Sequence, residues 1–209
     1  MFRSLLVLLF YIVPIHLPAA DRTLLVLADS LSASYGIAIE DGWVSLLQKR
    51  LDASGHTYKV LNASISGDTT HGAKSRLDEI LGQSVPAITI VELGGNDGLR
   101  GLPVAEISKN LGEIITLLTS KGSSVLLVPM LLPPNYGKIY IEKFSNIYKQ
   151  LAADHDITLG RFILDGIAIR PELMQADGIH PKAEAQPMML ENVWTDLEPM
   201  LTAEDKTVP

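Results

Sequence analysis

Short apolar runs alternate with longer amphipathic segments along most of this chain, and this alternation restricts the possible folds more than any other feature. A run of four to six apolar residues bounded by turn residues is typical of a strand buried on both faces. The runs predict strands at Leu24–Leu27, Tyr58–Leu61, Ile88–Leu93, Val125–Met130 and Arg161–Leu164. The segments with helical periodicity predict helices at Trp43–Ala53, Gly72–Leu81, Val104–Lys121, Ile139–His155 and Ala183–Met200. Strands and helices in alternation indicate an α/β fold, a three-layer α/β/α sandwich with a central, mostly parallel sheet.

The first residues have the pattern of a signal peptide. Arg3 is followed by the apolar stretch Leu5–Val13, and Pro18-Ala19-Ala20 supplies small residues for cleavage. The stretch is shorter than the ~20 apolar residues that span a bilayer, so a cleaved signal is favoured over a retained anchor. We therefore expect a signal peptide at 1–20, one domain at 21–201 and a polar, frayed tail at 202–209. The expected location is the periplasm, with secretion beyond it left open.

The composition of the chain excludes several classes of function. The chain has 209 residues, which is enough for one domain with a sizeable core, and is 47% apolar and 20% charged. A formal net charge of −7 argues against a nucleic-acid partner. The absence of cysteine excludes disulfides, thiolate catalysis and cysteine-ligated zinc. No later segment is long and apolar enough to predict a membrane span, so we expect a soluble mature chain. We also expect a monomer that acts on a small-molecule substrate.

Polar residues follow the predicted strands, and the carboxyl ends of parallel strands gather at one edge of a sheet, where ligands bind. Asp29-Ser30 follows the first strand, and Asp177 and His180 precede the last helix. A serine hydroxyl is a weak nucleophile without a base, and His180 is the candidate base. Asp177, three residues earlier, can reach the imidazole through one tight turn and fix its tautomer. These residue types predict an acyl-transfer triad.

Four short blocks occur in order along the chain. They are Asp29-Ser30-Leu31-Ser32, Ser66-Gly67-Asp68, Gly94-Gly95-Asn96-Asp97 and Asp177-Gly178-Ile179-His180-Pro181. Together they resemble the SGNH (GDSL-type) hydrolase family, in particular its bacterial thioesterase, arylesterase and lysophospholipase branch. The resemblance implies a flavodoxin-like fold and an exported serine hydrolase of acyl esters, thioesters and lysophospholipids. It also implies that no cofactor and no metal is needed.

The resemblance further implies an oxyanion hole and an acyl groove. The expected donors are the backbone N–H groups of Ser30 and Gly67 and the side-chain amide of Asn96, and glycine permits a close approach of backbone to ligand. The segment 130–140 is expected to be a long loop that contacts substrate. The candidate groove residues are apolar or aromatic and lie near the predicted strand ends: Leu31, Ile65, Leu99, Leu102, Leu132, Pro133 and Tyr136.

Each block taken alone has a plainer explanation. A serine after a strand is commonly a helix cap, and Gly67 is commonly a turn residue. Asp29, Asp68 and Asp97 are possible Mg²⁺ ligands, although no set has the spacing of a calcium loop. The four blocks in order favour catalysis over these explanations. A carbohydrate O-acetylesterase or an acyltransferase with the same triad remains an alternative, as does a non-catalytic exported binding module.

Ala28 departs from the family pattern, which has glycine at this position. If the position required a positive φ, alanine would introduce about 1 kcal/mol or more of strain. If glycine serves only close packing there, one extra methyl group must be accommodated. Neither effect removes a catalytic group, so we expect an active enzyme.

Overall fold

A five-stranded parallel sheet forms the centre of the computed structural model, which describes residues 22–205. The strands are β1 (Arg22–Ala28), β2 (Tyr58–Asn62), β3 (Ile88–Glu92), β4 (Ser124–Leu127) and β5 (Thr158–Leu159). Their order across the sheet is β2-β1-β3-β4-β5, and every neighbouring pair is parallel. In the described part of the chain, no helix is both long and apolar enough to cross a bilayer.

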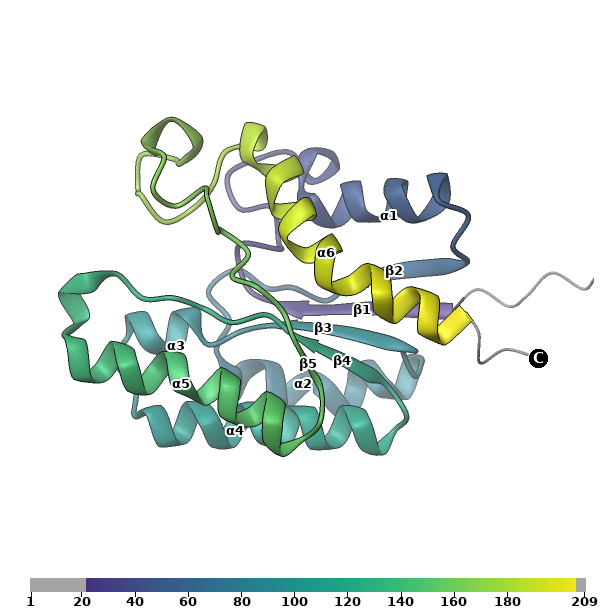
Figure 1. Cartoon of the computed structure of the whole chain (residues 1–209), viewed down its shortest axis with the longest axis horizontal. Coiled ribbons are helices and arrows are strands. Elements are labelled where there is room, and N and C mark those ends of the chain that lie inside the picture. Colours follow the sequence, from purple (N-terminus) through teal and green to yellow (C-terminus); the bar gives the residue numbers. More distant parts are fainter. Residues whose placement is uncertain (1–21, 206–209) are drawn as a thin grey trace, which may run out of the picture.

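Helices cover both faces of this sheet. They are α1 (Trp43–Ala53), α2 (Thr70–Gln83), α3 (Gly95–Leu99), α4 (Val104–Ser120), α5 (Lys138–Asp154) and α6 (Gln186–Asp205). Short 3-10 turns lie at η1 (Ile39–Asp41), η2 (Pro134–Tyr136), η3 (Pro171–Leu173) and η4 (Ala183–Ala185). Helices α1 and α6 lie on one face, and α2, α4 and α5 lie on the other (Figure 1). The predicted three-layer α/β/α sandwich is confirmed.

Burial explains why the central strands are apolar without alternation. All five residues of β3 are buried, as are the last five of β1, because helices cover both faces of these strands. Strand β2 lies at the edge and exposes three of its five residues.

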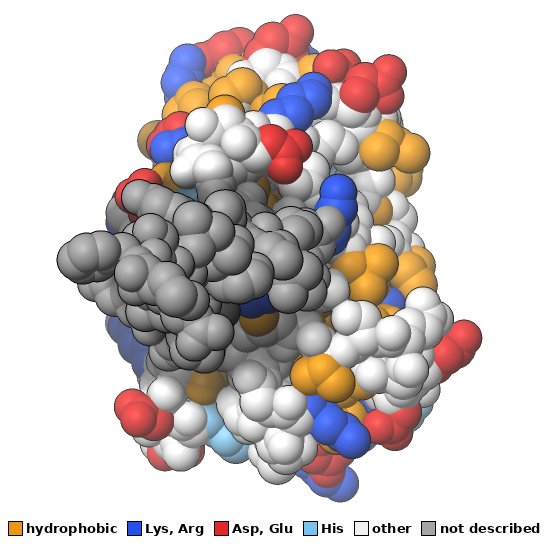
Figure 2. All heavy atoms as spheres, turned by 90° about the vertical axis from the view of Figure 1, so that its right-hand side faces the viewer, with side chains coloured by type: hydrophobic (Ala, Val, Ile, Leu, Met, Phe, Trp, Pro, Cys, Tyr) orange, Lys and Arg blue, Asp and Glu red, His pale blue; other side chains and the backbone are white. Residues whose placement is uncertain are grey.

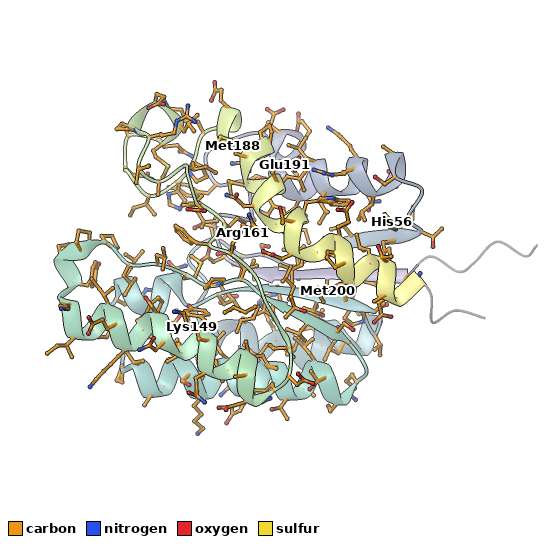
Figure 3. All side chains as sticks on the ribbon, viewed as in Figure 1. His56, Lys149, Arg161, Met188, Glu191 and Met200 are labelled. Atoms are coloured by element: carbon orange, nitrogen blue, oxygen red, sulfur yellow. The ribbon has the colours of Figure 1, made fainter. Side chains whose placement is uncertain are left out.

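Helices α1 and α6 are joined by an ion pair between Arg50 and Glu191, and the Arg50 guanidinium lies 4.2 Å from the centre of the Trp194 ring. Figure 3 labels Glu191 on α6.

The predicted strand at Arg161–Leu164 is wrong, and β5 lies just before it. The backbone N–H and the guanidinium of Arg161 both donate to Asp196 of α6, and the carbonyl of Ile163 accepts a hydrogen bond from Asn192. Ile163 is fully buried. This apolar stretch is therefore covered by α6 and does not extend the sheet.

Other boundaries also differ from the prediction. Helix α3 was not predicted, and β4 ends at Leu127, three residues before the expected end. The expected loop at 130–140 contains η2, and α5 already begins at Lys138. The last predicted helix opens as η4, and α6 then continues to Asp205, into the expected frayed tail. The predicted signal peptide lies outside the described residues.

The strand order defines where a site belongs. From β1 the chain goes to β2, on one side of β1, and then crosses to β3, on the other side of β1. In parallel sheets, ligands bind beyond the carboxyl ends of the strands at the point where the strand order reverses in this way. These ends lie at the left in Figure 1. The opposite end of the molecule, shown in Figure 2, carries acidic and basic side chains interspersed with apolar ones.

Candidate active site

Three side chains from two distant loops meet at this edge of the sheet. Ser30 Oγ lies 2.9 Å from His180 Nε2, and His180 Nδ1 lies 2.7 Å from Asp177 Oδ2. A carboxylate can only accept, so Nδ1 carries the proton in this pair and Nε2 is free to accept the serine proton. The arrangement can activate Ser30 as a nucleophile. Ser30 caps no helix, because the next helix, α1, begins only at Trp43.

The loop that holds Asp177 and His180 is tightly hydrogen-bonded. Asp177 Oδ1 accepts from the backbone N–H groups of Ile179 at 2.9 Å and His180 at 3.0 Å. Donation by the His180 N–H, followed by the imidazole and the Ile179 N–H, lowers the pKa of Asp177 to about 2. The Gln175 N–H donates to the His180 carbonyl at 2.7 Å. The carboxylate therefore stays ionised and oriented toward the imidazole at any ordinary pH.

The Asn96 side chain is held by the residue that precedes Ser30. Asn96 Nδ2 donates to Asp29 Oδ2 at 3.0 Å, while Asp29 Oδ1 accepts from the Leu31 N–H at 3.1 Å. One amide proton of Asn96 is thereby fixed, and the other remains for a ligand. Through these two bonds Asp29 joins the loop that carries Ser30 to the start of α3.

Gly67 occupies a turn that requires glycine for its backbone angle. Its φ is +79°, and a Cβ at this position would meet only Arg100, at 3.9 Å. The Gly67 carbonyl accepts from Arg100 Nη2 at 3.0 Å, and the Ile65 N–H donates to the Ala28 carbonyl at 3.1 Å. The loop after β2 is thus tied both to the end of β1 and to the loop after α3. Within residues 22–205, the N–H groups of Ser30 and Gly67 donate no hydrogen bond, so both are available to a ligand.

A buried acidic pair lies beside these groups. Asp29 is 2% exposed and Glu92 is fully buried. Burial raises the pKa of Asp29 to about 6, and burial together with the neighbouring Asp29 raises the pKa of Glu92 well above its usual range. Glu92 was not predicted from the sequence, because it ends an apolar run.

The other acidic residues considered as metal ligands serve the fold. Asp97 accepts from both the N–H and the hydroxyl of Thr70, at the start of α2. Asp68 forms an ion pair with Arg76 at 2.7 Å. No three His, Asp or Glu side chains in the described region are grouped as a metal-binding set.

The apolar candidates are divided between core and surface. Leu31 and Leu132 are buried at 6% and 8% exposure, whereas Ile65 is half exposed. The carbonyl groups of Leu99 and Leu102 accept hydrogen bonds from Tyr136 and Tyr140, at 2.9 and 2.7 Å, which ties the loop after α3 to the region around η2. Pro133 is exposed beside η2.

A cavity of about 740 Å³ opens next to this loop, between the first turns of α4 and the outer face of α5. Leu102 is the one predicted groove residue that lines it. Its other lining residues include Pro103, Val104, Tyr140 and Ile147, which the sequence did not single out. Apart from Leu102, no predicted groove residue lines this cavity, and neither Ser30 nor His180 does.

The structure decides between the two interpretations of Ala28. Ala28 is the last residue of β1 and is fully buried, and its φ is not positive. Alanine therefore introduces no backbone strain here, and only the packing of one methyl group distinguishes it from glycine.

Comparison with known proteins places this geometry in a family. A model of the GDSL-like lipase/acylhydrolase family matches residues 29–186. The chain belongs to this family. The resemblance seen in the sequence is confirmed, and the chain is a hydrolase of the acylhydrolase type.

Similar proteins cover nearly the whole chain. The chain is 50% identical over 183 residues to esterase TesA of Pseudomonas aeruginosa, covering 88% of this chain and 91% of that protein. It is 39% identical to thioesterase 1/protease 1/lysophospholipase L1 of Escherichia coli, covering 96% and 95%. Among solved structures, that of the esterase EstA from Pseudoalteromonas sp., inhibited by monoethylphosphonate, superposes with a TM-score of 0.84 at 39% identity. It covers 87% of this chain and 100% of that one.

Proposed function

We propose that this protein is an exported serine esterase and thioesterase that uses Ser30, His180 and Asp177 as its catalytic triad. The observation that carries the proposal is the continuous hydrogen-bonded series from Ser30 Oγ through the His180 imidazole to the Asp177 carboxylate. The names of its relatives, which include esterase, arylesterase and thioesterase, support the substrate class.

Acylation begins when Ser30 Oγ attacks the carbonyl carbon of the ester. His180 Nε2 takes the hydroxyl proton, and Asp177 stabilises the resulting imidazolium. The carbonyl oxygen becomes an oxyanion, which the N–H groups of Ser30 and Gly67 and the free amide proton of Asn96 stabilise. When the tetrahedral intermediate collapses, the alcohol or thiol leaves with the proton from His180, and the acyl group stays on Ser30.

Deacylation repeats these steps with water. His180 Nε2 removes a proton from a water molecule as the water oxygen attacks the acyl carbon. The second tetrahedral intermediate uses the same three donors. Its collapse breaks the bond to Ser30 Oγ, which recovers its proton from His180, and the free acid is released.

The acyl chain of the substrate is proposed to follow the loop after α3. Leu99 and Leu102 are half-buried there, and both are tied to tyrosines around η2 and α5. The cavity that Leu102 lines also has apolar surface from Val104 and Ile147, and we propose that a longer chain extends into it. This arrangement favours acyl substrates longer than acetate.

Labelling with a fluorophosphonate probe tests the triad directly. We expect covalent labelling of the wild-type chain, no labelling of Ser30→Ala, and retained labelling of Ser66→Ala, a matched serine exposed on the same edge. Labelling of Ser30→Ala would disprove the assignment of the nucleophile. No labelling of any variant would favour the binding module.

Substrate choice is tested with a panel on the same variants. The panel contains p-nitrophenyl esters of increasing chain length, acyl-CoA, a lysophospholipid and an acetylated polysaccharide. We expect kcat/KM to rise from acetyl to medium-chain esters. Exclusive activity on the acetylated polysaccharide would instead establish the O-acetylesterase alternative, and transfer of the acyl group to an added alcohol would reveal acyltransferase activity.

We also propose that the mature chain acts in the periplasm as a monomer. The apolar N-terminal segment with its small residues before Asp21 supports export. Ser30, Asp177 and His180 all come from one chain, so the triad needs no second copy. Fractionation of cells and light scattering of the purified enzyme test both statements.

A further inference from the structure

Glu92 and Asp29 place two carboxyl groups side by side in the protein interior. Glu92 is the last residue of β3, in register with Ala28 of β1, and Asp29 follows Ala28. The two carboxyl groups are close enough that the Asp29 charge raises the pKa of Glu92. The titratable groups that act on Asp29 from other elements are His180 and Asp68, and the buried Tyr148 hydroxyl faces the pair from α5. Neither carboxyl forms an ion pair with Lys or Arg within residues 22–205.

The two oxygens of Glu92 have different surroundings. Oε2 accepts from the Ser32 hydroxyl at 2.8 Å, and that hydroxyl in turn accepts from Trp43 Nε1 at 3.2 Å. The hydroxyl proton of Ser32 is therefore committed to Oε2. Oε1 is buried and makes no hydrogen bond in the described part of the chain, although the Asp29 N–H lies near the carboxyl and acts to lower the pKa of Glu92. A buried carboxylate oxygen without a donor is costly, whereas the same oxygen carrying a proton becomes a donor itself.

Asp29 is the acceptor available to such a proton. It already accepts from Leu31 N–H and Asn96 Nδ2, and a carboxylate has further lone pairs. Two adjacent buried carboxyl groups do not both ionise readily, so one of them keeps its proton. Asp29 accepts hydrogen bonds at both of its oxygens, whereas Glu92 accepts one at Oε2 and none at Oε1, so the proton belongs on Glu92.

We propose that Glu92 remains protonated in the working enzyme and donates Oε1–H to the Asp29 carboxylate, acting as a positioning residue for the Asn96 amide. The inference rests on the proposed function of Asn96 as an oxyanion donor. An ionised Asp29 holds one amide proton of Asn96, which directs the other toward the oxyanion. When Glu92 loses its proton as pH rises, repulsion between the two carboxylates displaces Asp29 and with it Asn96.

Two substitutions at Glu92 test this role by activity. Glu92→Gln keeps a donor toward Asp29 and an acceptor toward Ser32, whereas Glu92→Ala keeps neither. We expect Glu92→Gln to retain kcat within about threefold, and Glu92→Ala to lose about tenfold to hundredfold in kcat with little change in KM. As pH rises far enough to remove the Glu92 proton, the wild-type kcat should fall while that of Glu92→Gln should not. An equal loss in both variants, or full activity of Glu92→Ala, would overturn the proposal.

Infrared spectroscopy tests directly whether Glu92 carries a proton, and it requires no measurement of activity. At neutral pH the wild-type enzyme should show the C=O stretch of a protonated carboxylic acid, which disappears in Glu92→Gln and persists in Glu106→Gln, an exposed control on α4. Absence of this band from the wild-type spectrum would overturn the proposal even if Glu92→Ala does not fold. That result would leave the triad intact, since the triad is tested separately by labelling of Ser30.

Discussion

The ring of Tyr35 packs against the imidazole of His180, with 4.2 Å between ring centroids and 35° between ring planes. The two residues are also joined through Gln175, whose side chain donates to the Tyr35 carbonyl at 2.8 Å and whose N–H donates to the His180 carbonyl. Tyr35 is half exposed, so its ring forms one outer wall of the site. The imidazole is therefore positioned by a ring contact as well as by Asp177.

Replacing Tyr35 by alanine should lower kcat by about three- to tenfold, because a ring contact of this kind contributes about 0.5–1.5 kcal/mol. Tyr35→Phe keeps the ring and should retain nearly full activity. Steady-state kinetics on a short-chain p-nitrophenyl ester measure both. A Tyr35→Ala enzyme as active as the wild type would mean that Asp177 alone orients the imidazole.

Replacing Asn96 by alanine should remove one oxyanion donor and reduce kcat by about 10²- to 10³-fold, with a small effect on KM. The reason is that the amide strengthens its bond only as charge develops on the carbonyl oxygen. Asp29 keeps its bond to the Leu31 N–H in this variant, so the fold should be preserved. Circular dichroism tests whether the fold is preserved, and steady-state kinetics measure kcat and KM. A change confined to KM would argue against the oxyanion role.

Asp177 should make stability fall in strong acid. Hydrogen bonds from His180 lower the pKa of Asp177 from 3.8 to about 2 in the folded chain, so the folded chain binds this proton less tightly than the unfolded one. The contribution to stability is complete above about pH 4. It is lost as pH falls through the folded value, about 2. Urea unfolding of wild type and Asp177→Asn along this range should show a steeper acid loss for the wild type, and parallel curves would contradict the assignment.

Ala28→Gly should leave kcat within about threefold and reduce the free energy of unfolding by about 1 kcal/mol, since glycine in a strand costs backbone entropy. Ala28 is buried at the end of β1 without a positive φ, so glycine gains nothing from its backbone freedom there. Denaturant unfolding and ester hydrolysis measure the two effects. A large loss of activity would show that the site depends on the alanine methyl group.

The sequence patterns located most of the fold because the elements are long and periodic. Helix α1 begins and ends where predicted, since its apolar positions recur at helical spacing and Gly55 follows it. Helix α3 escaped prediction because its five residues include two glycines and no apolar stripe. Strand β5 has only two residues, too few for a period. The apolar residues at 163 and 164 correctly indicated a buried segment. They did not indicate that helix α6, and not a neighbouring strand, covers this segment.

The site was predictable where local motifs carry the chemistry and hidden where tertiary contacts do. Ser30, Asp177 and His180 are marked by short blocks, and the structure brings all three together. Tyr35 carries no such mark, because its contact with His180 joins residues far apart in the chain. Glu92 ends an apolar strand, and only the fold shows that its carboxyl group faces Asp29.

Ser30 lies in the first loop after the first strand, whereas His180 lies just before the last helix. Ser30 is thus made early in synthesis and His180 late, and the sheet must be complete before they meet. A partly synthesised chain cannot form the hydrogen bond between Ser30 and His180 until the segment that carries His180, next to the last helix, has been added and docked. The order of the sequence thereby makes the chemistry of Ser30 depend on completion of the whole fold.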